Sequence, residues 1–340
     1  MGYLFWIRKQ TVNICRICDS IADHPHYQPQ ERMFGWGDTF DYFKCQDCGC
    51  LQIVSIPVDL ARFYPTNYYS LSNEPLVRPS LPKRLLNRQK MRYRLTGKGA
   101  MWERLTWRLG GLPYGATEAL LYLKHIPGIR YNTRFLDVGC GEHSEWLGTL
   151  SRCGFTCLNG ADPYLSNAGK RNGIHYQQAP LDQVPGEFDV ISFHHSLEHI
   201  PDQRATLQNA HRLLARGGTC IIRIPLVDSL VWERYGVHWV ELDAPRHLYL
   251  HTQASLAQLA IKTGFDVVRT QHDSTEFEFA GSEQYLAGIP LTAPNSFWIN
   301  PLDNIFTEEQ MNQFRELAGQ VNLEGRGGRA AFYLRKHANS

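Results

Sequence analysis

Four cysteines near the start of the chain form two Cys-x-x-Cys pairs. Cys15 pairs with Cys18 and Cys45 pairs with Cys48, with 26 residues between the pairs. Each pair places two sulfur atoms on one tight turn, and two such turns can surround a Zn²⁺ ion with four thiolates. A site closed by four thiolates has no open position, so the pattern predicts a structural zinc ion. Unrelated buried or redox-active cysteines are the alternative, and Cys50 is not expected to be a ligand.

A second group of residues could hold a nucleoside. The largely apolar segment 135–138 runs into a turn that contains Gly139 and Gly141, and the acidic Asp162 follows 23 residues after Gly139. Glycines in such a turn let the backbone approach a ligand closely, and an acid at the end of the next strand can accept hydrogen bonds from ribose hydroxyls. For the turn taken alone, a tight connection between a strand and a helix is the alternative.

Two histidines are candidates for a base that works near neutral pH. His195 follows the segment 188–193, which reads as a buried strand, and His247 lies in a loop before a helix that Thr252 can cap. Either imidazole could take a proton from an acceptor group, and either could instead be an ordinary structural histidine. The chain has 14 histidines, so a few of them near one site prove little.

These residues need strands and helices that alternate, because ligands bind at the carboxyl ends of the strands in an open α/β sheet. Strands are predicted at residues 134–138, 155–161, 188–193, 219–224, 265–269 and 330–334. Helices with apolar residues at helical spacing are predicted between them, and the glycines at 217, 218 and 264 end two of these helices. The predicted fold class is therefore α/β.

The segments FLDVGCG at 135–141 and FDVISFHHSLEHIPD at 188–202, taken with Asp162, resemble the class I S-adenosylmethionine (SAM)-dependent methyltransferases. The resemblance covers roughly residues 131–270, with a last strand near residue 330. It implies a Rossmann-like, seven-stranded methyltransferase sheet with a small N-terminal zinc-binding module. It also implies that SAM is the methyl donor for a small-molecule acceptor.

The resemblance gives roles to the residues around the glycine turn. Asp137 would reach the amino group of the methionine moiety through water, and Asp162 would accept hydrogen bonds from both ribose hydroxyls. The backbone of Gly139, Cys140 and Gly141 would lie under the cofactor.

Further positions follow from the same resemblance. The backbone of Leu181 would donate a hydrogen bond to the adenine, and His194 would lie beside the cofactor at the end of the fourth strand. His195 and His247 remain the candidate bases. The chain departs from the usual Gly-x-Gly-x-Gly turn, because His143 replaces the third glycine. Its side chain could crowd the methionine moiety or contact the methionine carboxylate.

The loop around Arg246 and His247 bears on the acceptor. Similar sugar methyltransferases that carry a cysteine module hold a Glu-His pair in the loop that here contains Arg246 and His247. Because Arg246 replaces the glutamate, methylation of oxygen is favoured over carbon, and an anionic acceptor is suggested. The predicted acceptor is a sugar, nucleotide-linked or part of a glycan precursor. Tyr64, Tyr68 and Tyr69 could cover it or could pack between domains.

Three regions are expected along the chain: a zinc-binding module at 1–70, a basic helical connector at 71–130, and a methyltransferase domain at 131–340 with an insertion at about 275–325. The chain has 43% hydrophobic and 20% charged residues, which is ordinary for a globular protein. The absence of a long apolar run predicts no membrane span. Nine cysteines without an export signal predict a cytoplasmic protein with free thiols.

Positive charge is concentrated in the connector. The net charge of the chain is +2, yet the stretch from Arg78 to Arg108 contains ten basic residues and one acid, Glu103. A solvated helical face is the usual meaning of such a run. The stretch could also attract a phosphate-bearing acceptor or touch an anionic membrane surface.

Two other functions are kept as alternatives. An NAD-dependent oxidoreductase would need Gly-x-Gly-x-x-Gly, and Ser144 occupies the last glycine position. A non-catalytic protein that binds SAM or nucleic acid is the second alternative. Nucleic acid is disfavoured as a partner because the cysteine segment, Cys15 to Tyr69, is not basic.

Overall fold

The protein, described here from a computed structural model, divides into two compact units. The description covers residues 12–65, 79–97 and 111–337. Unit 1 takes the described residues up to Phe63, Pro225–Leu259 and His272–Ala330, and unit 2 takes those in Tyr64–Ile224, Ala260–Gln271 and from Ala331 onward. The N-terminal segment therefore packs with residues from the second half of the chain, a division that differs from the expected boundaries at 70 and 130.

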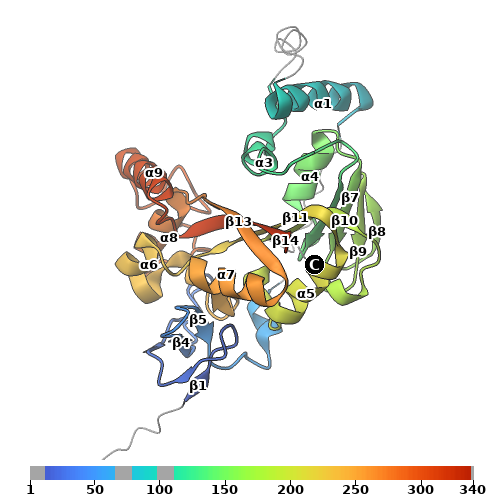
Figure 1. Cartoon of the computed structure of the whole chain (residues 1–340). Coiled ribbons are helices and arrows are strands. Elements are labelled where there is room, and N and C mark those ends of the chain that lie inside the picture. Colours follow the sequence, from blue (N-terminus) through green and yellow to red (C-terminus); the bar gives the residue numbers. More distant parts are fainter. Residues whose placement is uncertain (1–11, 66–78, 98–110, 338–340) are drawn as a thin grey trace, which may run out of the picture. The chain divides into compact units, whose positions relative to one another are not determined.

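Unit 2 is built on an eight-stranded sheet with the order β13-β14-β11-β10-β6-β7-β9-β8 (Figure 1). The strands are β6 (Arg134–Val138), β7 (Cys157–Ala161), β8 (Gly169–Arg171), β9 (Ile174–Gln177), β10 (Phe188–His194), β11 (Leu214–Pro225), β13 (Phe265–His272) and β14 (Arg329–Lys336). The ladders β11-β10-β6-β7-β9 are parallel, and β8 pairs antiparallel with β9. The fold is thus α/β and Rossmann-like, with a central, mostly parallel sheet.

The prediction of seven strands was wrong by one. The extra strand, β8, is a three-residue edge strand of polar sequence without a fully buried side chain, so it carries no hydrophobic signal. The neighbouring β9 was also missed in the sequence, although its Ile174 and Tyr176 are buried in alternation. Together the two strands form a short hairpin at the edge of the sheet.

The inner strands are buried on both faces, as expected for a parallel sheet that helices cover. Phe135 and Leu136 of β6 and Ile191 of β10 are fully buried. In the β6–β10 ladder, Asp137 lies opposite Ser192, and in the β6–β7 ladder it lies opposite Gly160. This register brings polar residues of neighbouring strands together at the carboxyl edge of the sheet.

Helices of unit 2 cover both faces of the sheet. They are α1 (Leu81–Thr96), α3 (Ala116–Leu123), α4 (Glu145–Arg152) and α5 (Gln203–Leu213), with the short 3₁₀ turns η3 (Leu181–Gln183) and η4 (Leu197–His199). Figure 1 shows α3 and α4 on one side of the sheet and α5 on the other, with α1 beyond α3. Ser144 caps α4 by accepting from Leu147 N, and Asp202 caps α5 by accepting from Ala205 N.

Unit 1 contains a small antiparallel sheet with the order β12-β5-β4-β3 and a separate β1–β2 pair. Its strands are β1 (Asn13–Ile14), β2 (Ile21–Ala22), β3 (His26–Tyr27), β4 (Tyr42–Lys44), β5 (Leu51–Ile53) and β12 (Tyr249–Leu250). Tyr249 pairs with Gln52, so a strand from the second half of the chain completes the N-terminal sheet. This long-range pairing explains why residues 12–63 do not form a unit alone.

The remaining helices flank the small sheet or follow it in the chain. They are η1 (Leu60–Phe63), α6 (Leu230–Tyr235), η5 (Gly236–His238), η6 (Val240–Leu242), α7 (Gln253–Lys262), α8 (Glu276–Leu286) and α9 (Glu308–Leu323). The predicted insertion at 275–325 therefore holds two helices, α8 and α9, which pack on each other. Within the described part of the chain, no helix is both long and apolar enough to cross a bilayer.

Candidate functional site

The glycine turn after β6 is packed closely against its neighbours. Gly139 and Gly141 have φ angles of 69° and 59°, in the left-handed region that glycine adopts without steric cost. The amide of Gly139 donates to the Ala161 carbonyl over 2.8 Å. A Cβ on Gly139 would lie 2.5 Å from the Cβ of Ser196, so position 139 has no room for a side chain. The turn can therefore bring its backbone close to a ligand.

Asp137 is buried at the carboxyl end of β6. Its two carboxylate oxygens accept hydrogen bonds from the hydroxyls of Ser144 (2.7 Å) and Ser192 (2.8 Å). Burial raises the pKa of Asp137 to about 6, although both serine contacts act in the opposite direction. The carboxylate is thus fixed in place, and an ammonium group of a ligand would favour its ionised form.

Asp162 stands directly after β7 and ties the glycine turn to its own loop. It accepts from Gly141 N over 3.0 Å and from Tyr164 N over 2.8 Å, one bond to each carboxylate oxygen. Each oxygen of an ionised carboxylate has a second acceptor site, so these bonds leave capacity for two ribose hydroxyls. Burial raises the pKa of Asp162, while the two backbone bonds oppose that shift.

Cys140 and His143 have different environments in the turn. The Cys140 side chain is buried in the apolar core, where a Cβ on Gly160 would lie 2.7 Å from its sulfur. Only its backbone can therefore face a ligand. His143 is half-buried and lies outside the set of residues with positive φ, so its backbone conformation does not require glycine. The turn can therefore fold with His143 in place of the third glycine of the usual Gly-x-Gly-x-Gly pattern.

His194 and His195 end β10 in two different ways. The His194 ring packs against the rings of Tyr122 and Trp146, with centroid distances of 5.6 and 4.7 Å. His195 has a φ of 50°, which is strained for a residue with a side chain. Its Nδ1 lies 3.4 Å from Oε1 of Glu198, a carboxylate with no exposed side-chain surface, whereas the His195 side chain is 26% exposed. The chain thus holds a partly exposed imidazole against a buried acid.

His199 completes this group within unit 2. Its Nδ1 lies 3.1 Å from the hydroxyl of Tyr64, and the two rings meet edge to face. Of the aromatic run considered in the sequence, Tyr64 is described, while Tyr68 and Tyr69 lie outside the described residues. Tyr64 therefore contacts the segment that follows β10.

Leu181 is the first residue of η3, and its side chain is buried. Pro180 precedes it in an extended conformation, and the turn closes with a bond from Val184 N to the Leu181 carbonyl. The predicted adenine contact would use the Leu181 backbone, which this turn places in a loop between β9 and β10.

His247 and Arg246 belong to unit 1 and are both buried. Nδ1 of His247 lies 2.7 Å from the Glu241 carbonyl, which can only accept, so Nδ1 carries the proton. Burial lowers the pKa of His247, which favours the neutral ring. Arg246 is fully buried and bonds to Glu31 (2.8 Å) and Asp243. These internal pairs neutralise its charge, so the expectation of an anionic acceptor loses its basis.

The two cysteine pairs of unit 1 form turns of the same geometry. The amide of Asp19 donates to the Cys15 carbonyl, and the amide of Gly49 donates to the Cys45 carbonyl, both over 2.9 Å. Asp19 and Gly49 have φ angles of 69° and 74°, the left-handed conformation that ends each turn. Each pair therefore forms a knuckle that can present two sulfurs to one side.

The four sulfurs of the knuckles lie within 4.8 Å of one another. Sγ of Cys15 is 3.6 Å from that of Cys48, and Sγ of Cys18 is 3.5 Å from that of Cys45. A tetrahedral zinc ion with bonds of about 2.3 Å needs sulfurs about 3.8 Å apart, so the set fits zinc. The contact with Cys48 lowers the pKa of Cys15 and favours a thiolate there. Cys50 is buried but not part of the cluster.

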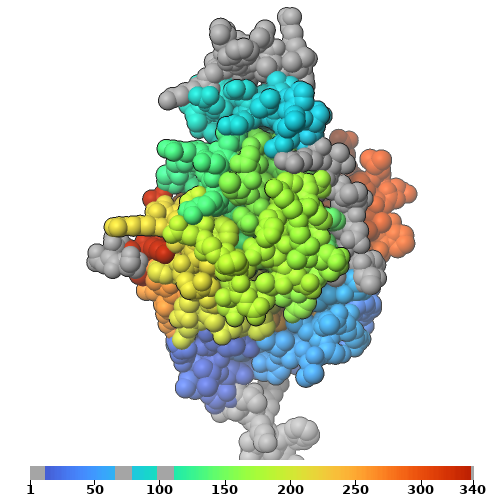
Figure 2. All heavy atoms as spheres, turned by 90° about the vertical axis from the view of Figure 1, so that its right-hand side faces the viewer, coloured from blue at the N-terminus to red at the C-terminus, as the bar shows by residue number. Residues whose placement is uncertain are grey.

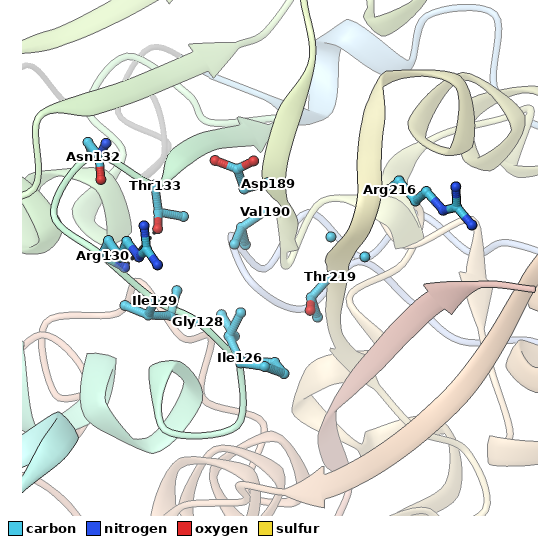
Figure 3. A pocket seen from close by; sticks show the side chains of 13 residues that line it. Ile126, Gly128, Ile129, Arg130, Asn132, Thr133, Asp189, Val190, Arg216 and Thr219 are labelled. Atoms are coloured by element: carbon cyan, nitrogen blue, oxygen red, sulfur yellow. Dashed lines mark hydrogen bonds between the residues drawn. The ribbon is translucent and has the colours of Figure 1, made fainter. Parts of the chain in front are cut away.

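A cavity of about 330 Å³ in unit 2 lies at the other edge of the sheet. Its lining includes Thr133, which precedes β6, and Asp189 and Val190 at the start of β10, so it lies at the amino ends of parallel strands (Figure 3). The side chains of Arg130 and Arg216 lie on opposite sides of it and do not converge. This cavity is therefore separate from the glycine turn and Asp162.

Comparisons with known proteins identify the central region. Residues 108–270 match a family model described as a methyltransferase domain. This region is a methyltransferase domain. The ubiquinone biosynthesis O-methyltransferase of Psychrobacter arcticus is 31% identical over 152 residues, which cover 39% of this chain and 58% of that protein. The enzyme of the same name from Psychrobacter cryohalolentis is 30% identical with the same coverage. The chain thus spans less than two thirds of these relatives.

Solved structures of methyltransferases resemble the domain at low identity. A SAM-dependent methyltransferase from Mesorhizobium loti is 16% identical with a TM-score of 0.41, covering 65% of this chain and 97% of that one. A cyclopropane synthase from Mycobacterium tuberculosis is 19% identical with a TM-score of 0.41, covering 65% and 83%.

Several residues of the methyltransferase domain were given no role in the site from the sequence. They are the serines that hold Asp137 or sit beside Gly139, and the acid beside His195: Ser144, Ser192, Ser196 and Glu198. Ser144 stands before a helix and follows a glycine turn, which is a recognisable N-cap signal. The others have no local signal, because their partners lie on neighbouring strands or in a strained turn.

Proposed function

We propose that this protein transfers a methyl group from SAM to an oxygen atom of a small-molecule acceptor. The observation that carries this proposal is the hydrogen bond from Gly141 N to the Asp162 carboxylate. It links the glycine turn to the acid proposed to bind the ribose, and the two together are called the cofactor cradle. The methyltransferase match over residues 108–270 supports SAM as the ligand of that cradle.

The cradle suits each part of the cofactor. Position 139 lacks room for a Cβ, so the backbone of the turn can lie under a flat or extended ligand. Asp162 would bind the ribose hydroxyls, and Asp137, fixed by two serines, would balance the charge of the methionine amino group. The Leu181 backbone is the proposed donor to the adenine, and His194 is proposed to lie beside the cofactor at the end of β10. The bound SAM supplies an electrophilic methyl group, so the protein must mainly align the acceptor and exclude water.

His195 is the proposed general base for the acceptor hydroxyl. It stands at the carboxyl end of β10, and its Nδ1 is oriented by the buried Glu198. A carboxylate on one ring nitrogen directs the other, Nε2, toward a substrate proton. His247 is the second candidate. Burial favours its neutral form, but its Nδ1 is committed to a carbonyl.

Two observations bear on the acceptor. The curated relatives are named O-methyltransferases, which supports oxygen as the methylated atom. A sugar acceptor rests on the analogy of the cysteine knuckles with those of sugar methyltransferases, and the neutralised Arg246 no longer argues for an anionic one. The four cysteines are proposed to bind a structural Zn²⁺ ion that holds unit 1 together.

Calorimetry with SAM and with NAD⁺ tests the function. We expect SAM to bind with a dissociation constant in the micromolar range and NAD⁺ not to bind. Incubation with methyl-labelled SAM and soluble metabolites of the host, followed by identification of the labelled product, would name the acceptor. Absence of SAM binding at high micromolar concentration would reject the proposal, and label on a carbon atom would reject oxygen as the acceptor.

A further inference from the structure

Helix α1 combines positive charge with exposed leucines. Its sixteen residues contain no acid and six basic residues: Lys83, Arg84, Arg88, Lys90, Arg92 and Arg94. Lys90 is buried, and the other five reach the surface at least in part. The helix is therefore a cationic element of unit 2 with no acidic residue of its own.

The inner face of α1 is fixed on unit 2. Met91 is fully buried and joins the apolar core of the domain. The Asn87 side chain donates to the Arg152 carbonyl over 3.0 Å, and the guanidinium of Arg88, at the border between the inner and outer faces, stacks on the ring of Tyr131. The orientation of the helix is thus determined by contacts along one side, which leaves the opposite side to solvent.

The outer face presents Leu81, Leu85 and Arg92. At 100° per residue these positions fall within about 40° around the helix axis. Leu81 is 71% exposed and Leu85 is 61% exposed, although both are large apolar residues. Figure 2 shows α1, in cyan, at the surface beyond the green helices α3 and α4. Two leucines one turn apart therefore stand among cationic side chains on an open surface.

We propose that the outer face of α1 docks on an anionic lipid surface. Positive side chains are attracted by the negative headgroups, and leucines gain by entering the boundary between headgroups and acyl chains. A nucleic-acid backbone would satisfy the arginines but offers the two leucines no apolar partner. The helix would lie in the plane of the membrane surface, because it is too polar to enter the bilayer.

This docking is separate from the proposed methyl transfer. The face contains none of the residues assigned to SAM or to the acceptor proton. Its place in the same unit as the cofactor cradle means that a docked protein would hold its methyltransferase domain near a membrane. The docked enzyme could then reach a lipid-linked acceptor, and a soluble acceptor could still reach the enzyme.

Vesicle sedimentation with the full-length protein tests the proposal. Vesicles would contain phosphatidylcholine alone or phosphatidylcholine with about one third phosphatidylglycerol. We expect binding to the anionic vesicles only, weakened at least about 5-fold when the salt concentration rises from about 0.1 to 0.5 M, because salt screens exposed charges. Retention in the supernatant with both kinds of vesicle would overturn the proposal.

A charge variant and a double leucine variant separate the contributions of charge and apolar surface on the outer face. Arg92→Glu, and Leu81→Ser with Leu85→Ser, should each weaken vesicle binding at least about 5-fold. Matched changes elsewhere should leave it unchanged: Lys124→Glu, and Leu302→Ser with Leu323→Ser, where the leucines are 97% and 92% exposed. SAM affinity and the circular dichroism spectrum check that each variant is folded.

The same variants show whether the outer face of α1 binds a lipid surface or only a polyanion such as nucleic acid. If the wild-type protein sediments but the leucine pair can be replaced without effect, the surface recognises charge alone and the lipid proposal is wrong. Equal binding to a single-stranded oligonucleotide, insensitive to the leucine variant, would assign the face to nucleic acid. Equal losses in the matched controls would show that the vesicle binding is not specific to α1.

Discussion

The two units of the chain are stabilised by different kinds of interaction. Unit 2 has an extended sheet whose inner strands bury Phe135 and Ile191 completely, so its stability comes mainly from apolar packing. The strands of unit 1 are two or three residues long. That unit buries Arg246 against carboxylates and gathers four cysteine sulfurs. A small sheet provides little core, and ionic contacts together with the proposed zinc ion would take over part of its role.

Unit 1 and unit 2 should respond differently to substitution. Changes at the cysteines or buried ion pairs of unit 1 should alter the free energy of unfolding. Changes at the strand ends of unit 2 should alter catalysis or cofactor affinity with smaller effects on folding, because those residues lie at the edge of an apolar core. Variants in each unit can therefore test whether unit 1 mainly determines stability and unit 2 mainly determines catalysis and cofactor affinity.

Replacement of Cys45 and Cys48 by serine should have the largest effect. The variant would lose zinc and the knuckle it closes, with a fall of at least about 4 kcal/mol in the stability of unit 1, since a structural zinc ion contributes folding free energy directly. Metal content by mass spectrometry and thermal unfolding measure this. The half-buried thiol in unit 2 provides the control variant Cys157→Ser, which should keep both properties.

Two results would contradict the expectation for the cysteines. Full zinc retention in the double variant would reject the site. A loss of SAM affinity of 10-fold or more, alongside the lost zinc, would show that the chemistry of unit 2 depends on unit 1, and the division between the units would fail.

Replacement of His195 by glutamine should lower kcat for methyl transfer by about 10²- to 10⁴-fold, the usual contribution of a general base. The KM for SAM should change little, because the ring is assigned to the acceptor side. Steady-state kinetics with labelled SAM measures both, and His175→Gln, on an exposed position of β9, is the matched control. An unchanged kcat would remove His195 as the base.

Replacement of Asp162 by alanine should weaken SAM binding by about 10- to 100-fold, or about 1.5–3 kcal/mol for lost hydrogen bonds to a charged group. The same change also removes the bond that holds Gly141. Calorimetry measures the dissociation constant, and Glu316→Ala on the exposed side of α9 is the control. Equal affinity in the two variants would show that the ribose does not lie at Asp162.

The sequence predicted the parts of the site that depend on neighbours in the chain. The knuckles are defined by residues within five positions of each other, and the glycine turn with Asp162 follows the repeating α/β order. The pattern from Cys15 to Cys48 and that from Gly139 to Asp162 are therefore visible in the sequence alone. The serines around Asp137 are not, because Ser192 reaches it only through the register of β6 with β10.

Long-range pairing limited the prediction of the fold. β12 completes the N-terminal sheet from residues 249–250, and no local pattern connects that strand with β5. The meaning of Arg246 changed for the same reason. In the sequence it was a cation near a candidate base, while in the structure its partner Glu31 lies 215 residues away.

The smallest effect should come from a buried acid of unit 1. Glu278 has no exposed surface and lies 4.0 Å from Arg329, which also contacts Glu241 and Asp273. Burial raises the pKa of Glu278 well above 4.5, and the negative charge of Glu241 adds to the shift. The folded protein therefore keeps a proton that the unfolded chain releases above about pH 4.5. In that window the folded state binds more protons, so its stability falls as the pH rises.

Glu278→Gln removes this titration. Between pH 5 and 8 the free energy of unfolding should fall less for the variant than for the wild-type protein. The difference between the two falls should be about 1 kcal/mol, since one pKa unit corresponds to about 1.4 kcal/mol. Urea unfolding at both pH values measures the difference, with Glu316→Gln as the exposed control. If both variants show the same pH dependence as the wild type, Glu278 is ionised in the folded state. Arg329 would then balance three buried carboxylates, and ionic contacts would contribute more to the stability of unit 1 than a protonated Glu278 allows.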